Sequence, residues 1–249
     1  MHVDRADQLA DAALTISGGA AHRAIFFEGR EGIGKTALLS EMRRRHTDSS
    51  VFYVDLGDHY AEWEVMNAIA RQAAGQGIRM DAFRALKQRY GDLPTVLFDG
   101  AHVNRSHVDI ALSVNANREA QQSALADELV ATLHEAATDT RPVLLLDGFE
   151  RCEPPLRDWL TTSFVPDLLS GRRIAVFLAG RVVPRLSEAY AGSIRTLVLP
   201  PFDTRTVEEW IELAGIEELK GLAQVVCTGT AGLPGMINEF LANFPSAGG

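Results

Sequence analysis

The chain has 249 residues, a length that suits one large domain or one domain with a small appendage. Its composition, 46% hydrophobic and 23% charged, is that of an ordinary globular protein and excludes disorder of the whole chain. With 24 basic and 33 acidic residues, the net charge of −9 argues against a surface that gathers nucleic acid or anionic membrane over its whole area.

The cysteines and the N-terminal residues indicate the cellular compartment. Cys152 and Cys227 are too few for a disulfide framework or a closed zinc site, which favours a reducing cytosol. No apolar run approaches the roughly eighteen residues of a membrane-spanning helix, and residues 1–7 are too acidic for a signal peptide. We therefore expect a cytoplasmic protein without a membrane partner.

Six segments rich in β-branched and aromatic residues predict strands. Several are continuously apolar, which is typical of a parallel sheet with both faces covered. Helical patterns lie between them, notably over 117–138, where Leu125, Leu129 and Leu133 recur at every fourth residue. This alternation predicts an α/β fold, with 108–114 as a further strand in an insertion or at a hairpin edge. The six predicted strands are 23–27, 51–56, 95–98, 143–146, 174–179 and 195–199.

After Pro200 and Pro201 the strand pattern stops. Residues 204–244 predict three short helices, separated by Gly215 and by a turn over 229–234. We interpret these helices as a small lid that follows the sheet.

Residues 29–36 read Gly-Arg-Glu-Gly-Ile-Gly-Lys-Thr and match the phosphate-binding pattern GxxxxGK(S/T) at every required position. An apolar strand leads into this loop, and an amphipathic helix over 36–45 leaves it. Glycines let consecutive backbone N–H groups face an anion, and the helix N-terminus adds its dipole. The alternative is a glycine-rich turn with a solvated lysine. The predicted nucleotide-binding residues of the loop are Gly29, Gly32, Ile33, Gly34, Lys35, Thr36 and Ala37.

Four side chains have predicted roles in phosphate chemistry. Lys35 reaches the β- and γ-phosphates, and the Thr36 hydroxyl binds Mg²⁺, which prefers oxygen ligands. Asp147 supplies the expected second metal ligand at the end of the aliphatic run Val-Leu-Leu-Leu-Asp. Glu150 follows within reach and is predicted to be the general base that polarises the attacking water.

A competing carboxylate is Asp99, which follows the shorter apolar run Val-Leu-Phe. We prefer Asp147 because its strand is longer and more aliphatic, and because only Asp147 has a second carboxylate nearby. Asp99 is then a turn residue after an edge strand.

Arg181 ends the apolar segment 174–181. Ligands of open α/β sheets gather at the carboxyl ends of the strands, and a planar guanidinium matches phosphate oxygens. We predict that Arg181 binds the γ-phosphate and senses its loss; the alternative is a surface arginine after a strand. The predicted catalytic residues are thus Lys35, Asp147, Glu150 and Arg181.

Other signals are interpreted as structural. Arg43, Arg44 and Arg45 close the helix after the loop, where cations complement the helix dipole, so a nucleic-acid contact is not expected. His102 and His107 have no cysteine or carboxylate framework around them and are interpreted as surface residues rather than metal ligands. Core or interface aromatics are expected at Trp63, Trp159 and Trp210.

These motifs together resemble the STAND class of P-loop NTPases, which includes the NACHT and NB-ARC proteins, and especially its bacterial members. Residues 3–9 look like the family's hydrophobic-(Gly/Asp)-Arg box, whose backbone contacts adenine, so the resemblance places Val3 and Arg5 beside the base. Residues 146–150 are similar to the NACHT form of the Walker B sequence, with its additional acid.

The resemblance extends to the end of the chain. Residues 178–181 look like the family's sensor strand ending in arginine, and 232–234 look like the GxP motif of the helical lid. The resemblance implies that Pro234 packs beside adenine. It also implies a three-layer P-loop NTPase fold of the ASCE type, with the sheet order 5-1-4-3-2 and a lid that opens under nucleotide control.

This comparison divides the chain into three parts. A nucleotide-binding domain is expected over 1–201, the helical lid over 202–244 and a flexible tail over 245–249. A full STAND protein also has a winged helix and repeats, which we do not expect in a chain that ends shortly after Pro234.

The function implied by the resemblance is an ATP-binding, slowly hydrolysing signal-transduction switch that uses ATP, ADP and Mg²⁺. Nucleotide state would set the lid position and thereby assembly with an effector or sensor protein, on a partner chain or in a longer parent protein, or as a homo-oligomer.

Two alternatives remain open. The first is an AAA-type loader or transposition ATPase that acts on DNA, a class that expects a lid arginine where this chain has Leu-Pro-Gly-Met over 233–236. The second is a nucleotide-binding scaffold without turnover. It is suggested by Arg151, which follows Glu150 where NACHT members usually carry further acids.

Overall fold

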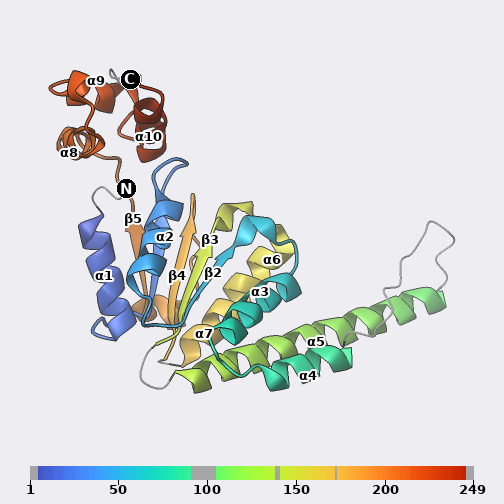
Figure 1. Cartoon of the computed structure of the whole chain (residues 1–249). Helices are drawn as coiled ribbons and strands as arrows, with labels where there is room; N and C mark the ends of the chain where they lie inside the picture. Colours follow the sequence, from blue (N-terminus) through green and yellow to red (C-terminus); the bar gives the residue numbers. More distant parts are fainter. Residues whose placement is uncertain (1–4, 91–104, 138–140, 172, 245–249) are drawn as a thin grey trace.

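The computed structural model describes residues 5–90, 105–137, 141–171 and 173–244. Within these ranges five strands form one parallel sheet in the order β2-β3-β4-β1-β5 (Figure 1). This is the order 5-1-4-3-2 read from the other edge, so the predicted α/β class and sheet order are confirmed. The strands are β1 (Ala24–Glu28), β2 (Val51–Asp55), β3 (Val143–Asp147), β4 (Ala175–Gly180) and β5 (Ile194–Val198).

The central strands are apolar on both faces and lie between two helical layers. In β3, Leu144 and Leu146 belong to the hydrophobic cluster on one face, whereas Val143 and Leu145 belong to the cluster on the other. Side chains alternate between faces along a strand, so a continuously apolar strand needs cover on both sides. One layer contains α1 (Ala6–Ser17) and α2 (Lys35–Arg45); the other contains α3 (Glu62–Gly75), α5 (Arg105–Ala136), α6 (Pro154–Trp159) and α7 (Val165–Ser170).

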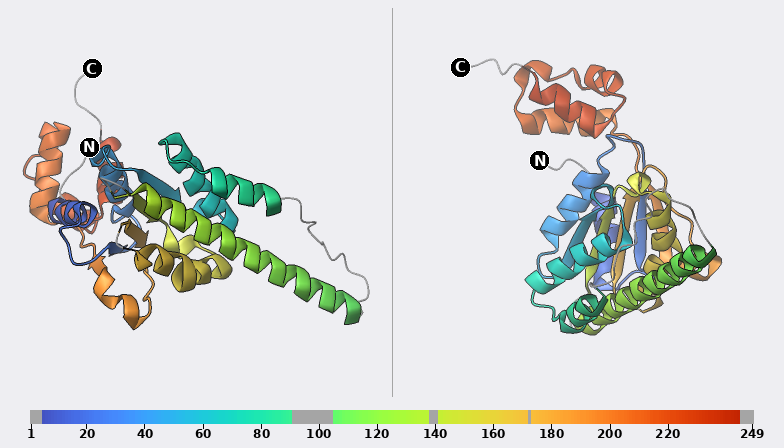
Figure 2. Two further views of the ribbon diagram at one scale, coloured as in Figure 1. Left: turned by 90° about the horizontal axis from the view of Figure 1, so that it is seen from below. Right: turned by 90° about the vertical axis from the view of Figure 1, so that its right-hand side faces the viewer.

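The long helix α5 corrects two expectations. It packs beside α4 (Asp81–Tyr90) and extends beyond the sheet (Figure 2). The strand predicted over 108–114 is wrong because these residues lie within α5, and the helix predicted over 117–138 begins earlier and ends at Ala136. The β-branched residues over 108–114 resemble a strand, yet the helix contains no glycine or proline that would interrupt its propagation.

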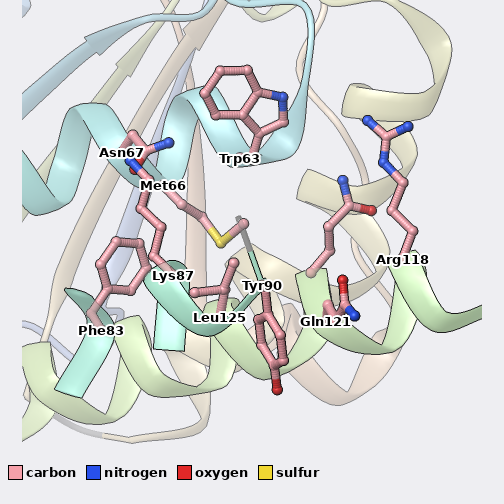
Figure 3. A pocket seen from close by; sticks show the side chains of 10 residues that line it. Trp63, Met66, Asn67, Phe83, Lys87, Tyr90, Arg118, Gln121 and Leu125 are labelled. Atoms are coloured by element: carbon pink, nitrogen blue, oxygen red, sulfur yellow. The ribbon is translucent and has the colours of Figure 1, made fainter. Parts of the chain in front are cut away.

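A groove lies between α3, α4 and α5, with a volume of about 190 Å³ (Figure 3). Apolar and polar side chains both line it, and Trp63, which is 45% exposed, is one of the apolar ones. The other two tryptophans are packed more closely. Trp159 stacks on Phe164 with ring centroids 4.5 Å apart, and Trp210 is buried among the C-terminal helices.

Three C-terminal helices form a separate hydrophobic cluster at the carboxyl end of the sheet (Figure 1). They are α8 (Thr204–Ala214), α9 (Ala223–Gly229) and α10 (Pro234–Ala242), in agreement with the three short helices predicted over 204–244. Asp203 caps α8 by accepting the Thr206 N–H at 2.8 Å, and Gly215, with a φ of +69°, ends it. The cluster consists of Phe202, Val207, Trp210, Ile211, Leu219, Ala223, Val226, Ile237 and Leu241.

The structure also places the arginines of α2, the two cysteines and the short helical turns. Arg44 and Arg45 pair with Glu41 of the same helix at 2.5 and 2.6 Å. Cys152 is buried and Cys227 half-buried, and neither forms a disulfide. Among the helices that the structure describes, none is both long and apolar enough to cross a membrane. Short turns of 3-10 or π helix lie at Leu56–Asp58, Phe149–Arg151, Leu160–Phe164, Glu188–Ser193 and Glu217–Leu219.

Candidate functional site

The loop that joins β1 to α2 requires glycine at three positions. Gly32 and Gly34 have φ values of +76° and +93°, in the left-handed region that favours glycine. At Gly29 a Cβ atom would lie 2.9 Å from Cγ2 of Ile33, so a side chain there would clash with the buried Ile33 side chain. Gly34 immediately precedes α2, whose first-turn N–H groups have no acceptor within the helix. The loop therefore presents backbone donors to an anion.

Lys35, the first residue of α2, is turned back into the loop. The residue is only 8% exposed, and its ammonium donates to the carbonyl oxygen of Gly29 at 2.6 Å and of Arg30 at 3.1 Å. Burial lowers the pKa of Lys35, and the nearby carboxylates of Glu150 and Asp147 oppose that shift. A phosphate in the loop would give this ammonium a charged acceptor, which binds more strongly than a carbonyl.

Asp147, the last residue of β3, is 2% exposed and contacts Thr36 directly. Its Oδ2 accepts the Thr36 hydroxyl at 2.6 Å and the Tyr53 hydroxyl at 3.0 Å. A buried carboxylate next to a hydroxyl is a donor set that suits Mg²⁺, so the two predicted metal ligands fit that ion. Burial, and next the negative charge of Asp147, raise the pKa of Tyr53, so the phenol stays protonated and can donate.

Glu150 and Arg181 meet where β3 and β4 end. The backbone N–H of Arg181 donates to Oε2 of Glu150 at 3.1 Å, and Nε of the guanidinium lies 3.8 Å from Oε1. The same guanidinium pairs with Glu31 of the loop. The Glu31 side chain is 80% exposed and that of Arg181 54%, so solvent weakens this pair and another anion can replace Glu31.

Strand β2 brings two residues to the site that sequence analysis did not identify. Tyr53 donates to Asp147, and Asp55, which lies opposite Asp147 in the parallel register, pairs with Arg151. Arg151 therefore lies between the ends of β2 and β3, next to Glu150 in the chain. The available signal was that β2, like β3, ends in an aspartate.

The first turn of α10 lies on the loop. The Gly235 N–H donates to the carbonyl oxygen of Gly32 at 2.8 Å, and a Cβ atom on Gly34 would lie 3.7 Å from the Pro234 ring. The chain reaches this position because Gly232, with a φ of +64°, turns back and accepts the Phe202 N–H at 2.8 Å. The predicted lid thus touches the loop through the backbone of Gly235 and the ring of Pro234, at the end of the motif 232–234.

Arg5 connects the loop to the start of the lid. Its guanidinium donates to the carbonyl oxygens of Ile33 at 3.0 Å and Pro200 at 2.9 Å. The guanidinium carbon also lies 4.7 Å from the centre of the Phe202 ring. The side chain of Arg5 therefore holds together three segments that are far apart in the sequence.

The remaining predicted site residues fall into two groups. Val3, Asp99, His102 and the strand predicted over 95–98 lie outside the described residues. The structure brings the other predicted site residues together. The loop over 29–34 continues directly into Lys35, Thr36 and Ala37 of α2. The loop, this helix or one another are contacted by Asp147, Glu150, Arg181, Arg5 and Pro234.

No protein-family model and no curated protein matches this chain. Among solved structures it is similar to a STAND protein with a tetratricopeptide repeat sensor from Pyrococcus horikoshii, at 13% identity and a TM-score of 0.64, over 99% of this chain and 31% of that one. A Walker-type ATPase of Pyrococcus abyssi matches at 14% identity and a TM-score of 0.55, over 98% of this chain and 69% of that one. The RuvB Holliday junction branch migration motor of Thermotoga maritima matches at 12% identity and a TM-score of 0.51, over 96% of this chain and 61% of that one.

These likenesses and the sheet order define the class of fold: the chain has the P-loop NTPase fold. The match to the STAND protein covers 99% of this chain and therefore extends over the C-terminal helices. The chain spans about a third of the length of that protein.

Proposed function

We propose that this chain binds ATP or ADP with Mg²⁺ in the loop over 29–36, hydrolyses ATP slowly, and uses nucleotide state to position its lid. The observation that carries the proposal is the convergence of complementary groups on this loop. Lys35 lies inside it, the Thr36–Asp147 pair lies at its end, and Arg181 pairs with its Glu31.

Each group has a role in phosphoryl transfer. The loop N–H groups and Lys35 bind the phosphates, and Thr36 and Asp147 hold Mg²⁺, which neutralises charge on the β- and γ-phosphates when bound. Glu150 takes a proton from water as the water oxygen bonds to the γ-phosphorus. The bond from that phosphorus to the β–γ bridging oxygen breaks, leaving ADP and phosphate, and Arg181 stabilises the charge that develops.

The lid contacts support a switch. Because Gly235 and Pro234 touch the loop, a change in the loop between ATP and ADP reaches α10 directly. We place adenine beside Val3, Arg5 and Pro234, as in the STAND class. The partner is an effector or sensor protein, on another chain or in a longer parent protein, or further copies of this chain in the cytoplasm; nucleic acid and membrane are not the proposed partners.

Calorimetry with ATP and Mg²⁺ tests the nucleotide site. Lys35→Ala should weaken binding by on the order of 2–4 kcal/mol, because a charge-assisted contact in a partly buried site is lost. Lys220→Ala is the matched control, because Lys220 pairs only with the exposed Glu217 among the contacts described and lies in the lid. Equal ATP affinity for wild type and Lys35→Ala would refute the site.

A scaffold without turnover is a second candidate, favoured by one observation. Arg151 places a cation beside Glu150, held by Asp55, where NACHT members usually carry acids. A phosphate-release assay decides between the two: turnover that depends on Glu150 supports the ATPase, and nucleotide binding without turnover supports the scaffold.

The likeness to RuvB favours a DNA-associated ATPase as a third candidate. Against it, residues 233–236 place no arginine at the start of α10. Measuring DNA binding over a range of salt concentrations separates this candidate, because phosphate contacts make affinity fall steeply with salt.

A further inference from the structure

Tyr53 lies against the carboxylate that we propose as a metal ligand. Its Oη donates to Oδ2 of Asp147 at 3.0 Å, and the same oxygen accepts the Thr36 hydroxyl at 2.6 Å. Tyr53 comes from β2 and Thr36 from α2, so hydroxyls from two separate elements converge on one buried oxygen. Two donors that approach from different elements restrict the carboxylate more than one donor does.

The backbone of Tyr53 is held on both of its sides. On one side β2 pairs with β3, with Tyr53 opposite Leu145. β2 is one of the two edge strands of the described sheet, and on its open side the side-chain amide of Gln72 from α3 takes the place of a neighbouring strand. The Tyr53 N–H donates to Gln72 Oε1 at 3.0 Å, and Gln72 Nε2 donates to the Tyr53 carbonyl at 2.8 Å. The sheet and α3 together therefore fix where the phenol stands.

We propose that Tyr53 is a positioning residue, whose hydroxyl holds Asp147 in the orientation in which Asp147 and Thr36 bind Mg²⁺. This inference rests on the proposed function, because it takes these two residues as the metal ligands. Tyr53 acts through Asp147 and does not itself contact the metal. A phenylalanine ring fills the same space, so Tyr53→Phe removes the donor while the packing stays.

Tyr53→Phe should affect only the Mg²⁺-dependent part of ATP binding. Loss of a hydrogen-bond partner behind a metal ligand typically costs about 10- to 100-fold in metal affinity. Thr36 still holds Asp147 in the Tyr53→Phe variant, so we expect the lower end, about a tenfold higher Mg²⁺ concentration for half-maximal ATP binding. The phosphates bind to Lys35 and to loop N–H groups, so ATP affinity in EDTA should be unchanged.

The experiment uses the full chain and calorimetric titration with ATP, in EDTA and at a series of MgCl₂ concentrations. Tyr60→Phe is the matched control, because Tyr60 is 75% exposed and its hydroxyl has no contact with Asp147. Gln72→Ala is a second variant that keeps the phenol but releases the backbone of Tyr53, and it should raise the Mg²⁺ requirement by a smaller factor. Thermal unfolding without ligand verifies that each variant folds. If Tyr53→Phe does not fold, the Mg²⁺ requirement of Gln72→Ala tests the proposal instead.

A raised Mg²⁺ requirement in Tyr53→Phe and Gln72→Ala, but not in Tyr60→Phe, supports the proposal. An unchanged requirement in Tyr53→Phe overturns it, and so does an equal loss of ATP affinity with and without Mg²⁺, which a purely structural residue would give. Lys35→Ala, measured in the same series, distinguishes the proposed function from this inference. If wild type binds ATP no better than Lys35→Ala, the nucleotide site itself is wrong and the inference falls with it.

Discussion

The carboxyl edge of the sheet and the lid contact the same loop, but they differ in how they are packed against the rest of the protein. β3 and β4 are buried along their whole length and pair with strands on both sides. The lid meets the loop through a backbone hydrogen bond from Gly235 to Gly32 and through Pro234 beside Gly34, and Leu233 packs in the hydrophobic cluster that contains Ile33 of the loop. Its nonpolar cluster is separate from the two clusters that cover the sheet.

Because of this difference, the groups proposed for hydrolysis and the helices proposed to move lie in separate parts of the protein. Asp147 ends a buried strand and cannot shift without disturbing the core, and the backbone N–H of Arg181 binds Glu150 beside it. The lid has a hydrophobic cluster of its own, so it can move without disturbing the packing between the sheet and its helices. A coupling of about 1–3 kcal/mol is sufficient for a nucleotide to move it. In the proposed function, hydrolysis therefore takes place at the edge of the sheet and the switch is the lid.

The largest expected effect concerns turnover at the edge of the sheet. Glu150→Gln keeps the size and an acceptor oxygen but removes the base, so ATP turnover should fall by about 10²- to 10⁴-fold while ATP binding is retained. Asp147→Asn should instead weaken the Mg²⁺-dependent part of ATP affinity. Phosphate release and calorimetry measure the two quantities.

Glu153→Gln is the matched control for this prediction, because Glu153 is exposed just beyond the turn that carries Glu150. It should hydrolyse ATP at the wild-type rate. Normal hydrolysis by Glu150→Gln, together with loss of hydrolysis in Asp99→Asn, would show that the carboxylates come from the competing segment.

A pair of core substitutions tests whether the sheet and the lid unfold separately. Leu145 of β3 and Ile237 of α10 are both fully buried. Leu145→Ala should lower the global free energy of unfolding by about 3 kcal/mol, because it leaves a cavity between two packed layers. Ile237→Ala should loosen the lid and leave the unfolding of the sheet near its wild-type urea midpoint.

Urea unfolding followed by circular dichroism and by the fluorescence of Trp210, kept as the sole tryptophan, distinguishes the two parts. Trp210 lies in the lid cluster, so its signal should respond to Ile237→Ala well before the sheet unfolds. A single transition that both variants shift equally would contradict the separation.

The smallest predicted effect concerns Glu31. This carboxylate pairs with Arg181 at the place where we expect the γ-phosphate, so Glu31→Gln should raise ATP affinity by about two- to fivefold, in line with the small contribution of exposed pairs. ADP affinity should not change, and Arg181→Ala should remove the gain. Competition titrations with a fluorescent ADP measure both; an equal gain for ATP and ADP would contradict the assignment.

Much of the fold could be predicted from the sequence because its strongest signals are local. The buried strands β1, β3 and β4 are continuous apolar runs, and the loop over 29–36 has glycines where the backbone requires them. The error over 108–114 has the same origin: β-branched residues favour a strand locally, whereas an uninterrupted helix runs through them.

The contacts around Asp147 could be predicted only in part. Its proximity to Thr36 follows from the motif and its strand. The approach of Tyr53, and the pair between Asp55 and Arg151, depend on the parallel register of β2 and β3, which places Asp55 opposite Asp147. Sequence patterns that identify each strand separately contain no information on that register.

Hydrogen exchange in ADP and in a non-hydrolysable ATP analogue tests the central claim, that nucleotide state moves the lid while the sheet stays fixed. We expect residues 204–244 to change protection between the two nucleotides, and 143–147 to remain protected in both. Arg181→Ala should remove the difference more than it weakens binding, because a ligand shifts an equilibrium only through contacts that differ between the two states. Identical exchange of 204–244 in both nucleotides, with wild-type binding intact, would contradict the switch.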